Sequence, residues 1–409
     1  MDIGKILSDG QSTDIFPGYI FDIDKFVKAI KRVKNAIGDM PLTYSIKANP
    51  YLLECIPEEV EHVEVCSPGE LLICMRYKIA GERIIYSGVN KGEKDVREAL
   101  QYGVDICSIE SLLQLKIVQK IAQEDNKTQK VLLRLSSGNQ FGLSEYDILS
   151  VLHTIQNYPN LKIIGVHYYS GTQKRKKQIE NDLFALDDFL TKAFGKDEQD
   201  TIFVEYGPGL GCSYFGDNYY EYEDEILTFF TGAIKSYREK YNIGIELGRF
   251  VAADCGAYLT RVVDVKENDG VNYVIVDGGT HQLKYYGHNM AMQVPKISVY
   301  SMNDDKTNTN RRHYTLCGSL CTVADILVND IELPQIKVGD FLAFEYCGAY
   351  SVTDSNVLFL SRDLPSVALW DEYNSMKYVR KHIDTYNLNC MQMLNSNNSQ
   401  FSCVGNCLC

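Results

Sequence analysis

Short apolar runs alternate with longer amphipathic stretches over the first 250 residues of the chain. Eight of these runs are rich in β-branched and aromatic residues, as strands are. They cover residues 42–48, 61–67, 82–88, 104–109, 131–137, 162–170, 202–207 and 243–248. In the stretches before and between them, apolar residues recur at three-to-four spacing, as in residues 22–38, 69–81, 108–125 and 178–195. The alternation predicts βα units around a parallel sheet.

Eight such strands are the number that closes a (β/α)8 barrel of the TIM type. A doubly wound open sheet gives a similar alternation, so the pattern alone leaves both folds open. From about residue 258 the pattern changes to strands without long helices, which predicts a second, mostly antiparallel β domain. Its strand candidates are residues 257–267, 271–279, 296–302, 311–319, 341–350 and 365–370. A helical pattern returns at residues 373–386.

Charge narrows the classes of partner. The net charge of −13 argues against nucleic acid and anionic membrane, and the basic cluster at residues 174–177 is explained by a solvated helix start. The first ten residues lack the apolar core of a signal peptide, and no apolar run is long enough to span a bilayer. We therefore expect a cytoplasmic protein that acts on a small molecule.

Thirteen cysteines are present, and nine of them lie in apolar segments, where reduced thiols behave as small hydrophobic side chains. The other four are in the polar C-terminal region: Cys390, Cys403, Cys407 and Cys409. Their spacing does not match a pair of CxxC motifs, so we expect no metal site. Residues 386–409 are expected to form a flexible, Cys-rich tail.

Polar residues and glycines gather where several predicted strands end, and a barrel builds its active site at that edge. Lys47 closes the first strand, the glycine-rich segment 207–211 follows the seventh, and Glu246 lies at the end of the eighth. Taken singly, they have ordinary explanations: a lysine that reaches water, a tight turn and a salt-bridged glutamate. Taken together, they are the parts that a pyridoxal phosphate site needs.

The chemistry of this cofactor gives each part a task. A lysine must lose its charge before it attacks the cofactor's aldehyde, and we expect partial burial to lower the pKa of Lys47 for that purpose. Glycine amides can approach a phosphate closely. A carboxylate such as Glu246 keeps the pyridine nitrogen protonated, so that the ring can accept electrons.

In its motifs the chain resembles the fold-type-III pyridoxal phosphate decarboxylases, the family of diaminopimelate and ornithine decarboxylases with an alanine racemase-like barrel. The resemblance covers about residues 20–370. In family order, the motifs are "YSIKANP", "CSPGE", "GVHYYSGTQ", "EYGPGLG", "ELGRF", "LCGSLCTVADIL" and "CGAY". The resemblance implies a cofactor-binding barrel over residues 22–258, and a β domain that combines residues 1–21 with residues 259–385.

The resemblance also implies roles by position. Lys47 is the Schiff-base lysine, Glu246 is the partner of the pyridine nitrogen, and Cys321 is the general acid that returns a proton to the substrate carbon, with Asp325 nearby. The residues placed around the cofactor phosphate are Thr172, Gly207, Pro208, Gly209, Arg249 and Tyr350. In the family the cysteine segment reaches the neighbouring subunit, which implies a head-to-tail homodimer with shared active sites.

Some positions depart from the family pattern. Tyr169 stands where a histidine usually stacks on the cofactor ring, and an aromatic face can still stack there. Thr322 follows the cysteine, where diaminopimelate decarboxylases carry a glutamate. After "DGG" the chain offers Lys284, Tyr285 and His288 to the substrate in place of the usual arginine. Strict diaminopimelate specificity is therefore not expected.

The leading interpretation is an α-decarboxylase for a diamino acid, or for a conjugated or carrier-protein-bound amino acid. The missing glutamate and arginine favour the second group. An amino-acid racemase is the alternative enzyme, but racemases pair an arginine with the pyridine nitrogen, whereas this chain offers Glu246. A non-catalytic barrel that stores the cofactor is a third interpretation, against which the second domain and its Cys321 motif argue. Release of carbon dioxide, as opposed to inversion of configuration, separates the two enzymes.

Overall fold

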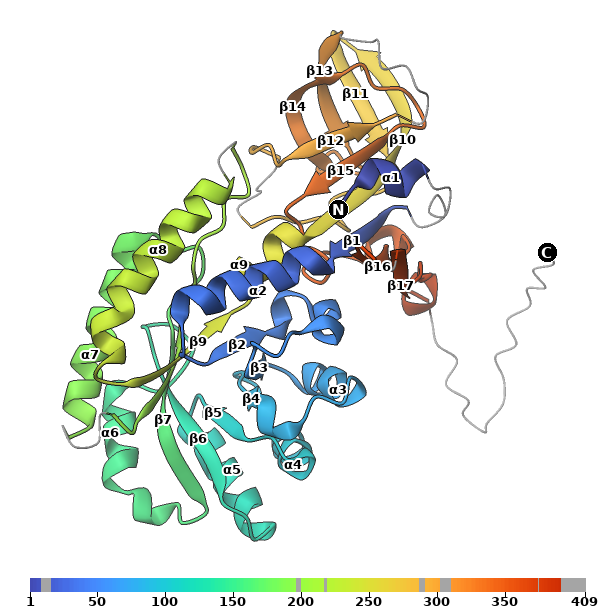
Figure 1. Ribbon diagram of the computed structural model, residues 1–409. Helices are drawn as coiled ribbons and strands as arrows, with labels where there is room; N and C mark the ends of the chain where they lie inside the picture. The colour runs from blue at the N-terminus through green and yellow to red at the C-terminus, as the bar shows by residue number, and fades with distance from the viewer. Residues whose placement is uncertain are drawn as a thin grey trace, which may run out of the picture.

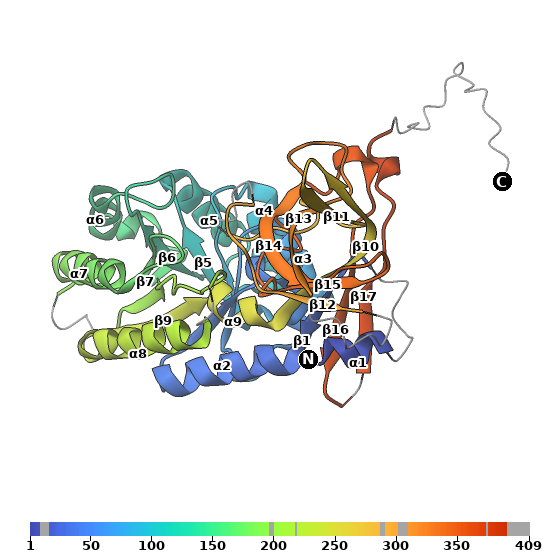
Figure 2. The same cartoon turned by 90° about the horizontal axis from the view of Figure 1, so that it is seen from above.

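The computed structural model describes residues 1–8, 16–195, 200–216, 219–286, 291–301, 310–373 and 375–390. Figure 1 shows a helix-wrapped barrel beside a sheet domain, and Figure 2 shows the same two bodies from above. Eight parallel strands close the barrel in chain order, because β2 pairs with β9. They are β2 (Leu42–Ser45), β3 (His62–Val65), β4 (Ile84–Tyr86), β5 (Ile106–Ile109), β6 (Gln129–Leu135), β7 (Leu161–Tyr169), β8 (Phe203–Gly207) and β9 (Asn242–Leu247). The predicted barrel is confirmed, and the open sheet is excluded.

Helices cover the outside of the barrel (Figure 1). Helix α2 shows how the sequence sets them: Phe26, Ile30 and Val33 bury one face, Asp22 accepts a capping bond from the Lys25 amide, and Gly38 ends the helix at φ +72°. The α-helices are α1 (Ile3–Ser8), α2 (Ile23–Ile37), α3 (Pro68–Arg76), α4 (Glu93–Tyr102), α5 (Leu112–Glu124), α6 (Glu145–His153), α7 (Lys176–Ala193), α8 (Tyr219–Arg238) and α9 (Arg249–Ala252). Among the helices of the described ranges, none is both long and apolar enough to cross a membrane.

The inner face of the barrel is unusually polar. A small apolar cluster of Ile85, Ile106 and Leu132 lies near the amino ends of the strands. Two residues further along each strand, on the same face, polar side chains replace apolar ones. Apart from Gln129 at the start of β6, the buried polar residues of the barrel strands are Thr43, Ser45, Glu64, Ser108, Arg134, His167, Glu205 and Glu246. Barrels of this kind usually fill this space with Val, Ile and Leu, so the polar filling marks a site of chemistry.

The sheet domain contains nine strands within the described ranges, most of them antiparallel. The main path runs β14-β13-β11-β10-β1-β16-β17, and β15 pairs with both β10 and β12. The strands are β1 (Gly18–Asp22), β10 (Gly256–Asn268), β11 (Val271–Val276), β12 (Ile297–Tyr300), β13 (Arg311–Cys317), β14 (Ile326–Pro334), β15 (Phe341–Glu345), β16 (Ser366–Asp371) and β17 (Ser375–Arg380). The predicted antiparallel β domain is confirmed, and β14 is a strand that the sequence pattern did not predict.

The helix predicted at residues 373–386 is wrong. Residues Ser375–Arg380 form β17, which pairs antiparallel with β16 in the order Trp370↔Met376 and Asp371↔Ser375. The chain reverses direction between these strands, and the hydrogen bonds of the hairpin decide the structure. The apolar residues whose spacing suggested a helix lie instead on a strand that pairs with β16.

Cysteine chemistry is simple in the described part of the chain. All ten cysteines there are free. Cys74, Cys107, Cys212, Cys255 and Cys347 are buried, as expected of thiols that serve as small hydrophobic groups. Cys403, Cys407 and Cys409 lie outside the described residues, as does most of the predicted tail.

Candidate active site

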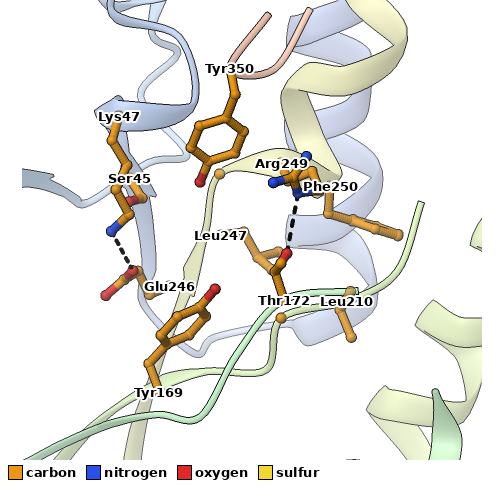
Figure 3. Close-up of a pocket in the computed structure, with 12 residues that line it drawn as sticks. Ser45, Lys47, Tyr169, Thr172, Leu210, Glu246, Leu247, Arg249, Phe250 and Tyr350 are labelled. Atoms are coloured by element: carbon orange, nitrogen blue, oxygen red, sulfur yellow. Dashed lines mark hydrogen bonds and ion pairs between the residues drawn. The ribbon is translucent and has the colours of Figure 1, made fainter. Parts of the chain in front are cut away.

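A pocket of about 360 Å³ opens at the carboxyl ends of the barrel strands (Figure 3). It is lined by Ser45, Lys47, Tyr169, Thr172, Gly209, Leu210, Glu246, Leu247, Gly248, Arg249, Phe250 and Tyr350. Seven of these were candidates from the sequence, and they come from five separate segments. The fold therefore gathers at one place the residues that the strand-end argument had selected.

Lys47 lies one turn beyond its strand, in a 3-10 turn (Ile46–Ala48) after β2, and does not close the strand itself. Its Nζ donates to Oε2 of Glu64 at 2.8 Å and to Sγ of Cys66 at 3.3 Å. Oε1 of Glu246 lies 3.7 Å from the same nitrogen. The lysine is thus held between two buried carboxylates.

These carboxylates reverse the expected pKa shift of the lysine. Burial acts to lower the pKa of Lys47, but the negative charges of Glu64 and Glu246 outweigh it and raise the pKa well above its ordinary range. Glu64 responds in the opposite sense, because Lys47 overcomes the effect of burial and holds the pKa of Glu64 below its ordinary value. The expectation of a lowered lysine pKa is wrong for the protein alone.

Glu246 is almost completely buried, with 7% of its surface exposed. Its Oε2 lies 3.2 Å from Nε2 of His167, and Nδ1 of that histidine lies 2.8 Å from Oγ of Ser108. The imidazole therefore connects the carboxylate to the opposite side of the barrel. One edge of Glu246 faces Lys47 and the pocket, and the other is held from below.

Arg249 forms the other end of the pocket. Its Nε donates to Oγ1 of Thr172 at 3.2 Å, and Nη1 donates to the hydroxyl of Tyr214 at 2.8 Å. The guanidinium carbon lies 4.4 Å from the ring centre of Tyr350 and 4.8 Å from that of Tyr286. Within the described ranges no carboxylate forms an ion pair with Arg249, so the site has an uncompensated positive charge that suits an anion.

Glycines keep the loop after β8 close to this arginine. Gly209 has φ +59°, and a Cβ there would lie 2.0 Å from the carbonyl oxygen of Gly171. A Cβ at Gly207 would lie 2.7 Å from the ring of Tyr169. Gly209 therefore lines the pocket, whereas Gly207 supports Tyr169 from behind, and neither Gly207 nor Pro208 belongs to the lining.

Tyr350 reaches the barrel pocket from the sheet domain. Its amide donates to the carbonyl oxygen of Ala48, next to Lys47, at 2.6 Å. The side chain of Asn49 donates to the carbonyl oxygen of Gly348 at 2.8 Å. The two domains are thus joined at the turn that carries the lysine, and both contribute to the lining.

Other candidates lie elsewhere in the chain. Cys321 is exposed on the loop between β13 and β14, outside the pocket lining. Asp325 is buried and accepts bonds from the amide and hydroxyl of Thr280, so it braces this loop. Lys284 pairs with Asp354 at 2.9 Å on the surface.

The remaining candidates for substrate contact are Tyr285 and His288. Tyr285 is buried, donates its hydroxyl to the carbonyl oxygen of Glu345, and packs edge-on against Tyr214. It thus supports the arginine site from behind and does not line the pocket. His288 lies outside the described residues.

Sequence reasoning did not select Glu64 or Tyr214, and it noted His167 at the end of a strand without giving it a role. Glu64 had a detectable signal, because it is the single charged residue between two valines of a short strand, two positions before Cys66. His167 lies two residues before Tyr169 on β7, so the two side chains share one face of the strand. Tyr214 had no such signal, since its contact with Arg249 depends on how the loop after β8 folds.

Known proteins share both the sequence pattern and the fold. A family model described as pyridoxal-dependent decarboxylase, C-terminal sheet domain, matches residues 19–348. The 2-[(L-alanin-3-ylcarbamoyl)methyl]-2-hydroxybutanedioate decarboxylase of Staphylococcus aureus is 27% identical over 85% of this chain and 92% of its own length. The L-glutamyl-[BtrI acyl-carrier protein] decarboxylase of Niallia circulans is 27% identical over 85% of this chain and 87% of its own length.

A solved structure agrees on the fold. The crystal structure of diaminopimelate decarboxylase from Helicobacter pylori, complexed with L-lysine, superposes with a TM-score of 0.79 at 22% identity and covers 94% of this chain and 98% of that one. At that identity the likeness concerns the fold alone, whereas the family model spans most of the chain. The chain belongs to the pyridoxal-dependent decarboxylases, and its activity is the removal of the α-carboxylate of an amino acid with pyridoxal phosphate as cofactor.

Proposed function

We propose that Lys47 holds the cofactor covalently and that Arg249, Thr172 and Gly209 hold its phosphate. The half-buried Arg249, which has no carboxylate partner among the described residues, supports this assignment, because a phosphate supplies the missing negative charge. The glycine at 209 lets the backbone come near without a side chain in the way. When bound, the cofactor ring takes up the electron pair that the departing carboxylate leaves behind.

Two further residues of the lining have roles toward the ring. Glu246 keeps a proton on the pyridine nitrogen, which its burial and its contact with His167 support. Tyr169 offers an aromatic face where the family usually has a histidine, and Gly207 leaves room for that ring. Glu246 is buried and Tyr169 is half-buried, so both side chains limit the access of water to the pocket.

Cys321 returns the proton to the substrate carbon in this proposal, but in the pocket of a second copy of the chain. Its exposure on a loop that Asp325 holds in shape supports such a role. A head-to-tail homodimer with two shared pockets follows. The ten free cysteines are consistent with a reducing cytoplasm, which we propose as the location.

A subunit-mixing experiment tests the shared site. Lys47→Ala and Cys321→Ala should each be inactive alone, and mixed dimers should regain up to about a quarter of the wild-type activity, because half the dimers carry one intact site. Mixtures that stay inactive while the chains exchange would overturn the assignment of Cys321 to a partner's pocket.

For the substrate, we propose an amino acid with a conjugated or carrier-bound side chain in preference to free diaminopimelate. The observation that carries this is the position after "DGG": Tyr285 is buried and bonded to the backbone at Glu345, so it presents no charge to a distal carboxylate. Thr322, which follows the cysteine, likewise has no charge for a distal amine. Two of the relatives act on amino acids that carry such groups, as their names state.

Carbon dioxide release should be measured on diaminopimelate, on ornithine and on a diamino acid whose side-chain amine is amide-linked to a polycarboxylate. We expect kcat/KM to be at least about tenfold higher on the amide-linked compound, which corresponds to about 1.4 kcal/mol of transition-state binding. Preferential release from diaminopimelate would overturn the substrate assignment and leave the family intact.

A further inference from the structure

Glu205 is a buried carboxyl group in the barrel for which the reaction has no assigned use. It belongs to β8, two residues beyond Phe203, and both side chains face the barrel interior. Strand register places Arg134, His167, Glu205 and Gly244 in one row across β6, β7, β8 and β9. The row lies one step deeper than Glu246, because Glu246 follows Gly244 by two residues on β9.

The glycine of this row makes room for the carboxyl group. A Cβ at Gly244 would lie 2.8 Å from Oε2 of Glu205 and 2.7 Å from the ring of Phe203. Any larger residue would therefore push Glu205 out of its place. The carboxyl group extends across the glycine toward the strand that carries Glu246.

Glu205 is removed from water, and the polar group that acts on its carboxyl group from within the described residues is the hydroxyl of Thr43, which is not placed for a well-formed hydrogen bond. Its exposed fraction is 0%, and neither carboxyl oxygen has a well-formed hydrogen bond within the described residues. No ion pair in the same ranges involves it; Lys47, the nearby cation, pairs with Glu64 and lies near Glu246. A buried carboxylate in this state is costly, and a neutral carboxylic acid is much less so.

The charges around Glu205 also favour its neutral form. The titratable and charged groups around Glu205 are His167 on β7, Glu246 on β9, Glu64 on β3 and, further along the row on β6, Arg134, which is already paired with Glu110; β2 presents the neutral hydroxyl of Thr43. Burial, followed by the negative charges of Glu246 and Glu64, raises the pKa of Glu205 to about 8. Two carboxylates already accompany one lysine, so a third would leave the cluster strongly negative.

We propose that Glu205 is held as a neutral, protonated acid and acts as a positioning residue beneath Glu246. It fills the space beside Gly244 and, while it keeps its proton, adds no second negative charge beside Glu246. Loss of this proton at alkaline pH adds a negative charge below the ring site. Such a charge opposes the increase in electron density that decarboxylation requires, so activity falls.

The first test uses the loaded enzyme and rests on the proposed function. We expect kcat of the wild type to fall above about pH 8, by about tenfold per pH unit. Glu205→Gln and Glu205→Met, both permanently neutral, should retain activity at pH 7 within about threefold and lose the alkaline decline. A decline that persists in both variants overturns the proposal, and so does a loss of more than about tenfold at pH 7.

Glu223→Gln is the matched control. Glu223 is a buried glutamate of helix α8 whose pKa burial also raises, but it pairs with Arg32 and lies outside the pocket lining. Its replacement should leave the alkaline decline unchanged. A decline that disappears in this variant as well would assign the effect to buried acids in general and overturn the role of Glu205.

The second test needs neither cofactor nor activity. An infrared difference spectrum at pH 7 between the cofactor-free wild type and Glu205→Gln should contain the carbonyl stretch of one protonated carboxyl group. Its absence shows an ionised Glu205 and overturns the proposal. Because this readout does not depend on turnover, it still decides the protonation state if the protein proves inactive on every amino acid.

Discussion

The two ends of the pocket hold their positive charges in opposite ways. At one end Lys47 lies between Glu64 and Glu246, so its charge is compensated twice. At the other end Arg249 is held by the hydroxyls of Thr172 and Tyr214 and by aromatic rings, and no carboxylate in the described part of the chain is bound to it. One cation is neutralised by the protein, and the other is left for a ligand.

The difference reflects what each cation does next. A lysine that becomes covalently attached is no longer a free ammonium group, so in the proposed function Glu246 becomes available to the cofactor ring. An arginine that binds a phosphate keeps its charge for good, so a permanent carboxylate partner would compete with the phosphate. The pocket is thus prepared for a ligand that reacts at one end and is only bound at the other.

The largest loss of activity should come from replacing Lys47, whose charge Glu64 and Glu246 compensate. Lys47→Ala removes the point of covalent attachment, and we expect kcat to fall by at least about 10³-fold. The near-visible absorption of the attached cofactor should disappear. Lys120→Ala, an exposed lysine paired with Glu93, is the control and should retain both. An unchanged spectrum in Lys47→Ala would refute the attachment site.

At the opposite end, Arg249→Met should weaken cofactor binding by about 10-fold to 100-fold, the range for hydrogen bonds to a charged group. The kcat measured at saturating cofactor should change much less, because the arginine does not touch the reacting carbon. Equilibrium titration of the cofactor-free protein measures the affinity. Arg97→Met, at an exposed ion pair with Glu124, should bind the cofactor as the wild type does.

The rate at which Lys47 reacts with the cofactor should depend on the negative charge of Glu64. The uncharged amine reacts, and the pKa of Lys47 is raised by Glu64, so the capture rate should rise with pH throughout the neutral range. Glu64→Gln removes one negative charge and lowers that pKa. Each unit of lowering speeds capture about tenfold at pH 7. A slower capture in stopped-flow absorbance would contradict the compensated-lysine model.

The smallest effect is expected from Tyr214→Phe. The substitution removes the hydroxyl that accepts from Nη1 of Arg249 but leaves the arginine in place. A threefold loss of cofactor affinity corresponds to about 0.7 kcal/mol, within the range of an ordinary hydrogen bond. Tyr146→Phe, on an exposed tyrosine, serves as the reference. A loss larger than that of Arg249→Met would show that Tyr214 contacts the ligand directly.

The sequence predicted the barrel strands well, because an apolar run and the turn residues at its two ends agreed for each strand. Each barrel strand is a short apolar run bounded by turn residues, and its register follows from burial on both faces. The same reasoning did not predict strand β17, because residues 376–380 are exposed or only partly buried and do not alternate strictly. Pairing with β16 makes these residues a strand, and the local sequence pattern alone does not predict that pairing.

Positions of the site residues were easier to predict than their charges. The lysine, the glycine loop and Glu246 were found because strand ends meet at one edge of a barrel. The raised pKa of Lys47 was not predicted, because it depends on Glu64 of the next strand and on distances that only the fold sets. Neither the uncompensated Arg249 nor the buried Glu205 can be distinguished by sequence from ordinary ion-paired residues.

Strand β1 has a consequence for how the chain folds. It lies between β10 and β16, with Tyr19 opposite both Tyr258 and Val367, so its partners follow it by more than 200 residues along the chain. Contacts of such long sequence separation slow folding and prolong the time during which strand edges are open to aggregation. Helix α2 and the barrel can assemble earlier, because their contacts are closer in sequence. We therefore expect the closure of β1, a strand outside the pocket lining, to be a late step of folding.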